Sequence, residues 1–330
     1  MTYVLNILIL VIGFLFLVKG ADFFVDNSSK IARKFHISPL VIGLTLVAFG
    51  TSLPELAVSF IASLTVEPGA TADIAMGNVI GSNIVNITLI LGLTAIVKPV
   101  FVAKSMYLKE FLFLIVSSVV LIVFALFFQM DQQIVWWEAL ILLAVFMYYI
   151  WVMIKTGKVE EEVSLPEPVN MKKALLFVLL GLIGVTAGGY MVTYGAQEIA
   201  VDVLVDIFNV DTSKAITLIG LTIVAVGTSL PEMVTSVVAA KKGENDIAFG
   251  NLVGSNIFNL LFILGLSGVV TTLGINYDVF IDMWILLGIT LIVLAFAMSG
   301  KHVTKKEGII LVLIYIAYVV YICLRAFNLF

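Results

Sequence analysis

The sequence predicts an all-α polytopic membrane protein with ten transmembrane helices in two five-helix repeats of inverted topology, and with broken helices at the membrane midplane. Three observations support this prediction: a mean hydropathy of +1.17, apolar runs of about 20 residues, and two sequence blocks that each occur twice. Hydrophobic residues make up 62% of the 330 residues and charged residues only 12%, which excludes a soluble globular protein.

Apolar stretches bounded by charge, or by Pro and Gly, define the expected spans. They run near residues 3–24, 39–66, 73–97, 106–128, 134–154, 172–195, 212–240, 246–270, 278–299 and 306–327. No basic residue precedes the first stretch and Lys19 follows its apolar run, so we expect a retained helix rather than a cleaved signal peptide. We expect the first repeat over residues 1–154, a cytoplasmic linker over 155–171, and the inverted repeat over 172–330.

Basic residues divide unevenly between the two sides of the membrane that these spans define. Of the 18 lysines and arginines, only Lys214 and Arg325 adjoin one side, and all the others adjoin the opposite side. The positive-inside rule makes the lysine-rich side cytoplasmic and places both termini outside.

Two sequence blocks each occur twice. Residues 42–55, which end in Gly-Thr-Ser-Leu-Pro-Glu, match residues 219–232, and residues 77–86 match residues 250–259. Such a match indicates an internal duplication. Because five spans, an odd number, separate the copies, the second copy must enter the membrane from the opposite side.

Glu55 and Glu232 are the only acidic residues expected well inside the spans. A charge at the centre of a transmembrane helix costs about 2.5 to 3.5 kcal/mol, so something must compensate each glutamate. No Lys or Arg occurs at comparable depth, so a buried salt bridge lacks its basic half. The partner is therefore expected to be a proton or a metal cation.

Pro54 and Pro231 each remove a backbone donor in the middle of a long span, so we expect both helices to break there. The freed oxygens suit a hard cation such as calcium, which takes about six to eight oxygen ligands. They are the carbonyls of Ala48, Thr51, Ala225 and Thr228 and the hydroxyls of Ser52 and Ser229. A kinked packing motif would explain the prolines but not the glutamates.

Polar residues at four-residue spacing line one helical face in each second block, and we expect this face to meet the broken helix. They are Asn78, Ser82 and Asn86 in the first copy and Asn251, Ser255 and Asn259 in the second. The Gly-x-x-x-Gly spacing beside them predicts close helix packing. Packing contacts alone could also explain the polar stripes, most of all Asn78 and Asn251.

The paired Gly-Thr-Ser-Leu-Pro-Glu and Gly-Asn-x-x-Gly-Ser-Asn-Ile-x-Asn blocks resemble the two alpha-repeats of the sodium/calcium exchanger family, in its prokaryotic type. The resemblance implies ten helices in two inverted halves, a central cation site, and a first helix of each half that slides across the site. It implies an antiporter of calcium and sodium in the plasma (inner) membrane. It implies no cofactor, no nucleic acid and no obligatory protein partner.

The resemblance also assigns roles to individual residues. Calcium, at a site shared with sodium, would bind Glu55, Glu232 and the backbone oxygens of Thr51 and Thr228. The sodium sites would add Ala48, Ser52, Ser82, Asn86, Ala225, Ser229, Ser255 and Asn259. Potassium-dependent relatives carry Asp where Asn259 stands, and proton/calcium exchangers typically show Gly-Asn-x-x-Glu in the first block. The neutral Asn259 argues against potassium coupling, and the Gly-Asn-x-x-Glu pattern is missing from this sequence, which favours sodium over protons as the counter-ion.

Other functions compete with sodium/calcium exchange. A proton/calcium or potassium-dependent antiporter is the alternative within the same class. A cation channel needs a continuous pore, whereas two inverted copies around one midplane site suit alternating access better. An intramembrane enzyme could use two carboxylates, but no companion nucleophile or zinc ligand accompanies them. We therefore predict an antiporter and not an enzyme. Exchange is expected to be electrogenic, because two carboxylates balance one calcium ion or two sodium ions and a further sodium ion adds charge.

Overall fold

The computed structural model describes residues 2–67, 71–101, 104–128, 133–156, 169–204, 225–300 and 302–326. Within these residues, eight helices are long and apolar enough to cross a membrane, and one bent helix pair makes a ninth candidate span. The protein is therefore a helical, multi-span membrane protein, as the hydropathy predicts. Residues 212–224 of the expected seventh span lie outside the described part, so the count of ten spans stays a prediction.

Both halves follow the same order of elements: a long helix, a broken helix, a helix with a π-helical segment at its middle, and two more helices. The first half contains α1 (Thr2–Lys34), α2 (Pro39–Ile42), η1 (Gly43–Val47), α3 (Ala48–Thr51), α4 (Leu53–Thr65), α5 (Asp73–Val85), η2 (Asn86–Ile90), α6 (Leu91–Val97), α7 (Lys104–Val123), η3 (Phe124–Phe128) and α8 (Trp136–Thr156). The second half contains α9 (Met171–Asp202), α11 (Ala225–Gly227), α12 (Leu230–Lys242), α13 (Asn245–Ile257), η6 (Phe258–Ile263), α14 (Leu264–Val270), α15 (Tyr277–Gly300) and α16 (Lys305–Ala326).

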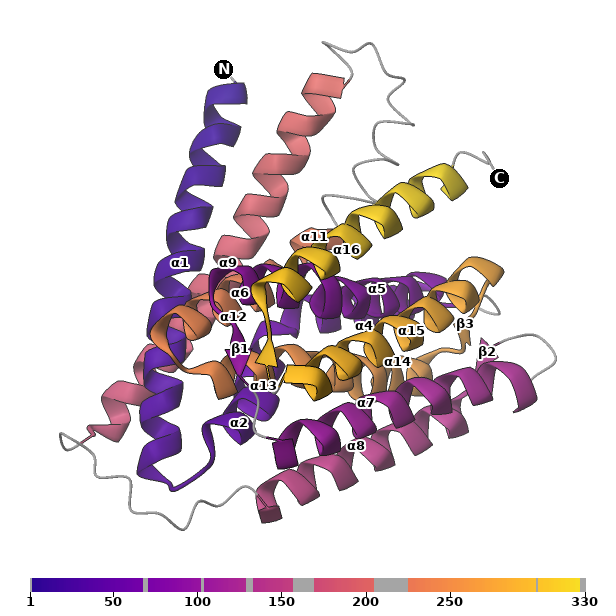
Figure 1. Cartoon of the computed structure of the whole chain (residues 1–330). Coiled ribbons are helices and arrows are strands. Elements are labelled where there is room, and N and C mark those ends of the chain that lie inside the picture. Colours follow the sequence, from indigo (N-terminus) through magenta and orange to yellow (C-terminus); the bar gives the residue numbers. More distant parts are fainter. Residues whose placement is uncertain are drawn as a thin grey trace.

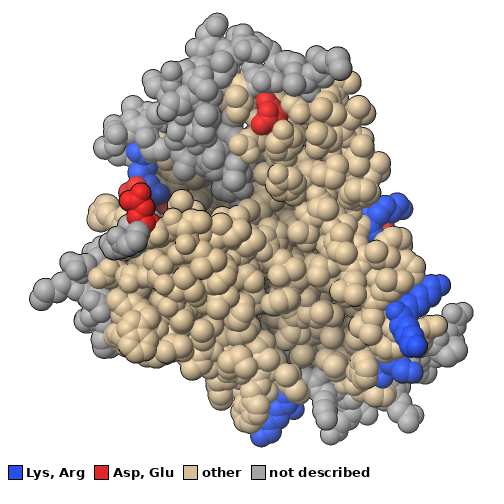
Figure 2. Space-filling view, turned by 180° about the vertical axis from the view of Figure 1, so that it is seen from behind, with Lys and Arg blue, Asp and Glu red and all other residues tan. Residues whose placement is uncertain are grey.

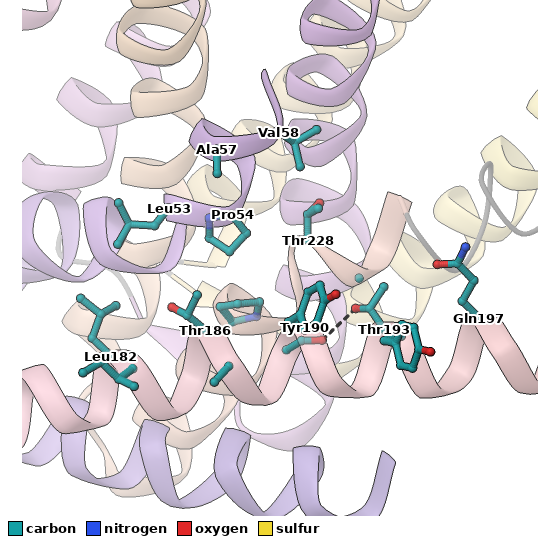
Figure 3. Close-up of a pocket in the computed structure, with 16 residues that line it drawn as sticks. Leu53, Pro54, Ala57, Val58, Leu182, Thr186, Tyr190, Thr193, Gln197 and Thr228 are labelled. Atoms are coloured by element: carbon teal, nitrogen blue, oxygen red, sulfur yellow. Dashed lines mark hydrogen bonds between the residues drawn. The ribbon is translucent and has the colours of Figure 1, made fainter. Parts of the chain in front are cut away.

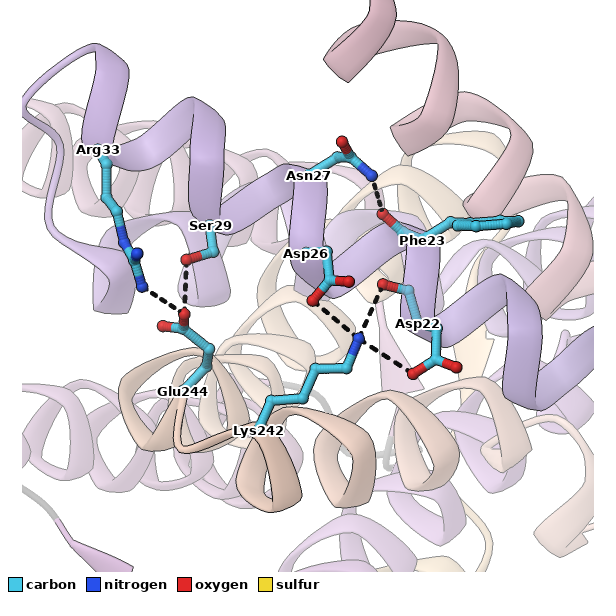
Figure 4. Close-up of polar contacts among 8 residues, drawn as sticks. All are labelled: Asp22, Phe23, Asp26, Asn27, Ser29, Arg33, Lys242 and Glu244. Atoms are coloured by element: carbon cyan, nitrogen blue, oxygen red, sulfur yellow. Dashed lines mark hydrogen bonds and ion pairs between the residues drawn. The ribbon is translucent and has the colours of Figure 1, made fainter. Parts of the chain in front are cut away.

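The first long helix extends further than the sequence predicts. Helix α1 ends at Lys34 rather than near residue 24, because charges that were expected to end the span are paired on its surface. The Nζ atom of Lys242 lies 3.0 Å from Oδ1 of Asp22 and 2.8 Å from Oδ1 of Asp26 (Figure 4). These ion pairs stabilise the polar end of the helix, which runs for about three turns beyond the apolar segment.

A second ion pair joins the same two regions of the chain. Arg33 on α1 contacts Glu244, which precedes α13, at 2.6 Å, and the hydroxyl of Ser29 donates to the same carboxylate oxygen at 2.8 Å (Figure 4). The end of α1 is therefore tied to the connection between α12 and α13.

Helices α1 and α9 lie side by side along one edge of the molecule, at a steep angle to α7 and α8 (Figure 1). Glycines allow their backbones to approach closely. A Cβ atom on Gly20 would stand 2.6 Å from the backbone nitrogen of Val185, and one on Gly181 would stand 2.6 Å from that of Phe24. No larger residue fits at these positions without a shift of the backbone, so α1 and α9 pack as one unit.

Helix α13 packs in the same way on the broken helix of the first half. A Cβ atom on Gly250 would stand 2.7 Å from the carbonyl oxygen of Leu40, and one on Gly254 would stand 2.7 Å from that of Leu44. The close packing predicted from Gly-x-x-x-Gly is therefore confirmed for the second copy. The equivalent glycines of the first copy are Gly77 and Gly81. A Cβ atom on either of them would have no described atom from outside its own helix within 4 Å.

Two pairs of short strands, which the sequence did not predict, join connections of the two halves. Strand β1 (Val100–Phe101) pairs antiparallel with β4 (His302–Val303), and β2 (Gln133–Ile134) pairs antiparallel with β3 (Leu273–Gly274). Two-residue strands carry too little alternation for a sequence signal. Each pair joins two connections that the predicted topology places on the same side of the membrane.

The outer surface is apolar, as a lipid-facing surface must be. Large exposed side chains include Phe16 of α1, Met147 of α8 and Ile316 of α16. The broad centre of the face in Figure 2 carries no charged side chain. The helices of the repeated second blocks, by contrast, are the most buried of the candidate spans, so polar residues on them lie inside the bundle.

Candidate cation site

The broken helix of the first half changes direction at Ser52, where its axis bends by 51°. Ser52 has φ −83° and ψ 11°, and Ser229 has nearly the same values, −90° and 7°, before α12. The predicted breaks are therefore present. They occur two residues before Pro54 and Pro231, whose ring nitrogens cannot donate to the preceding turn.

Glu55 and Glu232 lie in the first turns of α4 and α12, where the positive end of the helix dipole stabilises a negative charge. Both side chains are completely buried. The hydroxyl of Ser229 donates to Oε1 of Glu55 at 3.0 Å, and the hydroxyl of Ser52 donates to Oε1 of Glu232 at 2.8 Å. Each glutamate thus bonds the serine at the break in the other half, which brings the two carboxylates to one place.

Neither carboxylate forms an ion pair with a lysine or arginine in the part of the chain that the structure describes. The Oε2 atoms of Glu55 and Glu232 are buried, and among the described residues no donor reaches them. A buried carboxylate without a compensating group is costly. The arrangement is therefore chemically suited to a cation.

The structure buries all four predicted side-chain ligands from the second blocks, which are Ser82, Asn86, Ser255 and Asn259. The hydroxyl of Ser255 lies 3.5 Å from Oε1 of Glu232. The Oδ1 atoms of Asn86 and Asn259 are buried, and within the described ranges no group donates to them. Four oxygens at the site thus accept no hydrogen bond from the described residues: one from each glutamate, and one neutral oxygen each from Asn86 and Asn259.

Both of these asparagines lie in π-helical segments that the sequence did not predict. Asn86 is the first residue of η2, and Asn259 lies in η6. A π-helical turn inside an α-helix inserts an extra residue and is frequent at functional sites. The extra residue rotates all later side chains about the helix axis.

Two further asparagines, which sequence reasoning missed, hold these amides. The Nδ2 atom of Asn86 donates to Oδ1 of Asn256 at 3.1 Å, and Nδ2 of Asn259 donates to Oδ1 of Asn83 at 3.0 Å. The available signal was the repeated Gly-Ser-Asn, in which Asn83 and Asn256 follow the serines of the predicted site.

Asn78 and Asn251 brace the broken helices. Their Nδ2 atoms donate to the carbonyl oxygens of Glu55 and Glu232, each at 3.3 Å. The hydroxyl of Thr51 donates to Oδ1 of Asn251 at 2.9 Å. These bonds tie α5 to α4, and α13 to α12 and α3, which matches the packing alternative for the two asparagines.

The remaining predicted residues lie at the breaks. Ala48 is buried and its carbonyl oxygen accepts from the backbone nitrogen of Ser52 at 3.0 Å. Ala225 is the first residue of α11, and Thr228 lies in the turn between α11 and α12. The assignment of their carbonyl oxygens as ligands stays a prediction.

A cavity of about 780 Å³ lies between α9 and the broken helices (Figure 3). Thr186 and Tyr190 line it from α9, and Pro54 and Thr228 line it from the broken helices. The cavity therefore reaches the break in the second half, one residue from Ser229.

Comparison with known proteins places these features in context. The sequence profile of a family described as "Sodium/calcium exchanger protein" matches residues 5–155 and 173–324. The chain is 36% identical over 321 residues to the putative antiporter CaxA of Alkalimonas amylolytica, with 93% of this chain and 95% of the relative covered. It is 33% identical over 348 residues to the sodium/calcium exchanger MaX1 of Methanosarcina acetivorans, with 96% and 97% covered.

A solved structure matches over almost the whole chain. It is that of the sodium-calcium exchanger NCX_Mj soaked with 10 mM Na⁺ and 10 mM Sr²⁺, with a TM-score of 0.80 and 32% sequence identity. The match covers 96% of this chain and 98% of the other.

Proposed function

The chain belongs to the sodium/calcium exchanger family, and we propose that it exchanges calcium for sodium across a membrane by alternating access. The family and the structural likeness support a cation antiporter. The choice of ions, the direction of calcium extrusion and the net movement of charge are the proposal.

One observation carries the proposal: two completely buried glutamates, one from each half, each accept a hydrogen bond from a serine hydroxyl of the other half. Neither contacts a basic residue in the described part of the chain. Two carboxylates neutralise one calcium ion, and oxygen is the ligand that calcium prefers. The same pair neutralises two sodium ions. Binding of calcium and binding of sodium would therefore exclude each other, which is the requirement for exchange.

We assign the ligands accordingly. Calcium binds the carboxylates of Glu55 and Glu232 with the backbone oxygens of Thr51 and Thr228, and sodium shares this site. The further sodium ligands are the backbone oxygens of Ala48 and Ala225 and the side chains of Ser52, Ser82, Asn86, Ser229, Ser255 and Asn259. Four buried oxygens, two from the glutamates and two from Asn86 and Asn259, accept no hydrogen bond from the described residues, which supports this assignment.

Alternating access requires one part of the protein to move against the site. The glycine-mediated contact of α1 with α9 supports these two helices as the moving unit. On one side of the site, the cavity beside α9 reaches Thr228, and we propose it as the route by which ions enter (Figure 3). On the other side, the ion pairs of Lys242 with Asp22 and Asp26 hold α1 against α12 (Figure 4). The protein in this arrangement would therefore be open on the side of the cavity.

The layout of the membrane domain is part of the same proposal. Ten spans form two inverted repeats, residues 1–154 and 172–330, joined by a cytoplasmic linker over 155–171. Both termini lie outside, so the cavity faces the exterior. The pairing of β1 with β4, and of β2 with β3, supports this topology, because each pair joins connections assigned to the same side. The prokaryotic relatives favour the plasma membrane as the location.

Calcium-45 uptake tests the proposal. The full chain is reconstituted in vesicles loaded with sodium and diluted into sodium-free buffer that contains the isotope. We expect uptake that needs internal sodium and stops when an ionophore dissipates the sodium gradient.

Vesicles with equal internal choline or potassium are the controls. Uptake driven as well by a pH gradient without sodium would contradict sodium coupling and favour proton exchange. Uptake that needs no cation on the opposite side would indicate a channel.

A further inference from the structure

Four buried asparagines form a hydrogen-bonded chain between the two central helices. Asn86 donates to Asn256, and Asn259 donates to Asn83, through their side-chain amides. In addition, Nδ2 of Asn83 donates to the backbone carbonyl oxygen of Asn256 at 3.1 Å. The four asparagines come alternately from the two halves, so this series of hydrogen bonds crosses the interface at which the proposed cation site lies.

The last bond determines the orientation of Asn83 and, through it, that of Asn259. A backbone carbonyl oxygen can only accept, so Asn83 must turn its nitrogen toward Asn256 and its Oδ1 toward Asn259. That Oδ1 also can only accept, so Asn259 must present its nitrogen to it. The Oδ1 atom of Asn259 is then the free end of the amide, on a helix that also presents Ser255 to Glu232.

We propose that Asn83 and Asn256 are positioning residues that hold the amides of Asn259 and Asn86 with oxygen, and not nitrogen, toward the sodium sites. The inference rests on the proposed function, since it concerns the neutral ligands of the transported sodium. An amide presents a cation ligand at one end and two N–H donors at the other. A free amide that turns over would aim those donors at the ion.

The two positions are not equivalent. Asn83 uses both ends of its amide, whereas Nδ2 of Asn256 is buried and has no acceptor among the residues that the structure describes. The orientation of Asn256 is therefore held at one end only. Loss of the Asn83 side chain should disturb the sodium ligand Asn259 more than loss of Asn256 disturbs Asn86.

The test is sodium binding by the purified full chain. It is measured as the sodium concentration that gives half of the maximal rise in melting temperature. Asn83→Leu removes both amide ends at similar volume. We expect it to raise that sodium concentration roughly tenfold, because a buried ligand loses its hydrogen-bonded orientation. The half-saturating calcium concentration should change less than about twofold, because calcium depends on the two carboxylates. Asn256→Leu should shift sodium less.

A second variant separates orientation from damage to the fold. A carboxylate has an oxygen at each end, so Asn259→Asp has no orientation to lose. In the Asn259→Asp background, Asn83→Leu should raise the half-saturating sodium concentration less than about twofold. The effects of the two substitutions are therefore expected to be strongly non-additive. If Asn83→Leu does not fold, Asn83→Ser, whose hydroxyl cannot span both partners, takes its place in the same cycle.

Asn78→Leu is the matched control, because Asn78 is an amide on the same helix that braces the glutamate backbone. It should weaken both ions together. Equal shifts for sodium and calcium in Asn83→Leu, or an undiminished shift in the Asn259→Asp background, would overturn the positioning role. Because binding needs no gradient, absence of exchange in vesicles would contradict the proposed function alone.

Discussion

Two completely buried glutamates set the chemistry of the site. Glu55 and Glu232 have no exposed surface, and the described residues offer hydroxyl donors but no positive charge to them. Calcium loses much of its hydration when it enters such a place, and both negative charges are needed to compensate for that loss. The pair should therefore act as one unit, with neither member dispensable.

Glu55→Gln and Glu232→Gln test this dependence. Each change keeps the volume but removes one charge, so we expect calcium binding at least ~100-fold weaker and no measurable calcium-45 uptake. The two variants should have comparable effects. Glu67→Gln is the matched control because Glu67 is exposed beyond the end of α4, and it should transport normally. Normal uptake by either folded site variant would remove the glutamates from the mechanism.

The proposed movement of α1 and α9 as one unit requires these two helices to stay in contact. Their glycines make this contact possible, since a Cβ atom on Gly181 would stand 2.6 Å from the backbone nitrogen of Phe24. A methyl group at that position has no flexible side chain to displace, so it must separate the two helices. Glycine is therefore required here by packing and not by backbone conformation.

Gly181→Ala should destabilise the protein by about 1 to 3 kcal/mol, which is the usual cost of overpacking. The measurement is thermal unfolding of the purified chain in detergent. Gly288→Ala in α15 is the control, because no described atom lies within 4 Å of a Cβ atom there and alanine favours helix. It should leave the melting temperature unchanged or raise it. Equal melting temperatures for both variants would contradict close packing of α1 on α9.

The whole molecule places the site between its halves. Ser229 bonds Glu55 across 174 residues of sequence, and Asn259 bonds Asn83 across 176. The groups that would bind an ion therefore come from both halves, and the proposed movement of α1 with α9 would change access to them. With calcium, two carboxylates make a neutral site, and with three sodium ions they make a site of charge +1. In the proposed site, the neutral oxygens of Asn86 and Asn259 would be the ligands that accommodate a third sodium ion.

Voltage should therefore alter the rate of exchange. We expect an inside-negative potential, set with potassium and valinomycin, to speed sodium entry and calcium exit, because net positive charge enters with sodium. The measurement is calcium-45 efflux from vesicles at several imposed potentials. A parallel series without valinomycin controls for potassium as a substrate. Sodium-driven exchange that ignores voltage would mean two sodium ions for each calcium ion, with structural roles for the two amides.

The sequence by itself determined the features whose physics is local. The apolar length of each segment predicts a span, and Pro54 predicts the break that the structure has at Ser52, because an absent N–H acts within one turn. A carboxylate such as Glu55 in an apolar run predicts a cation site, because the free-energy cost of a charge inside the membrane requires a compensating group. The duplication pointed to the equivalent residues of the second half.

Only the tertiary structure decided which atoms meet. The bonds of Ser229 with Glu55 and of Asn83 with Asn259 join residues that no periodic pattern connects, and the length of α1 depends on charges paired with Lys242 far along the chain. The paired short strands have the same origin. Contacts of this kind depend on how whole helices pack. For that reason the sequence could predict the residues of the candidate site but not the direction in which each amide points.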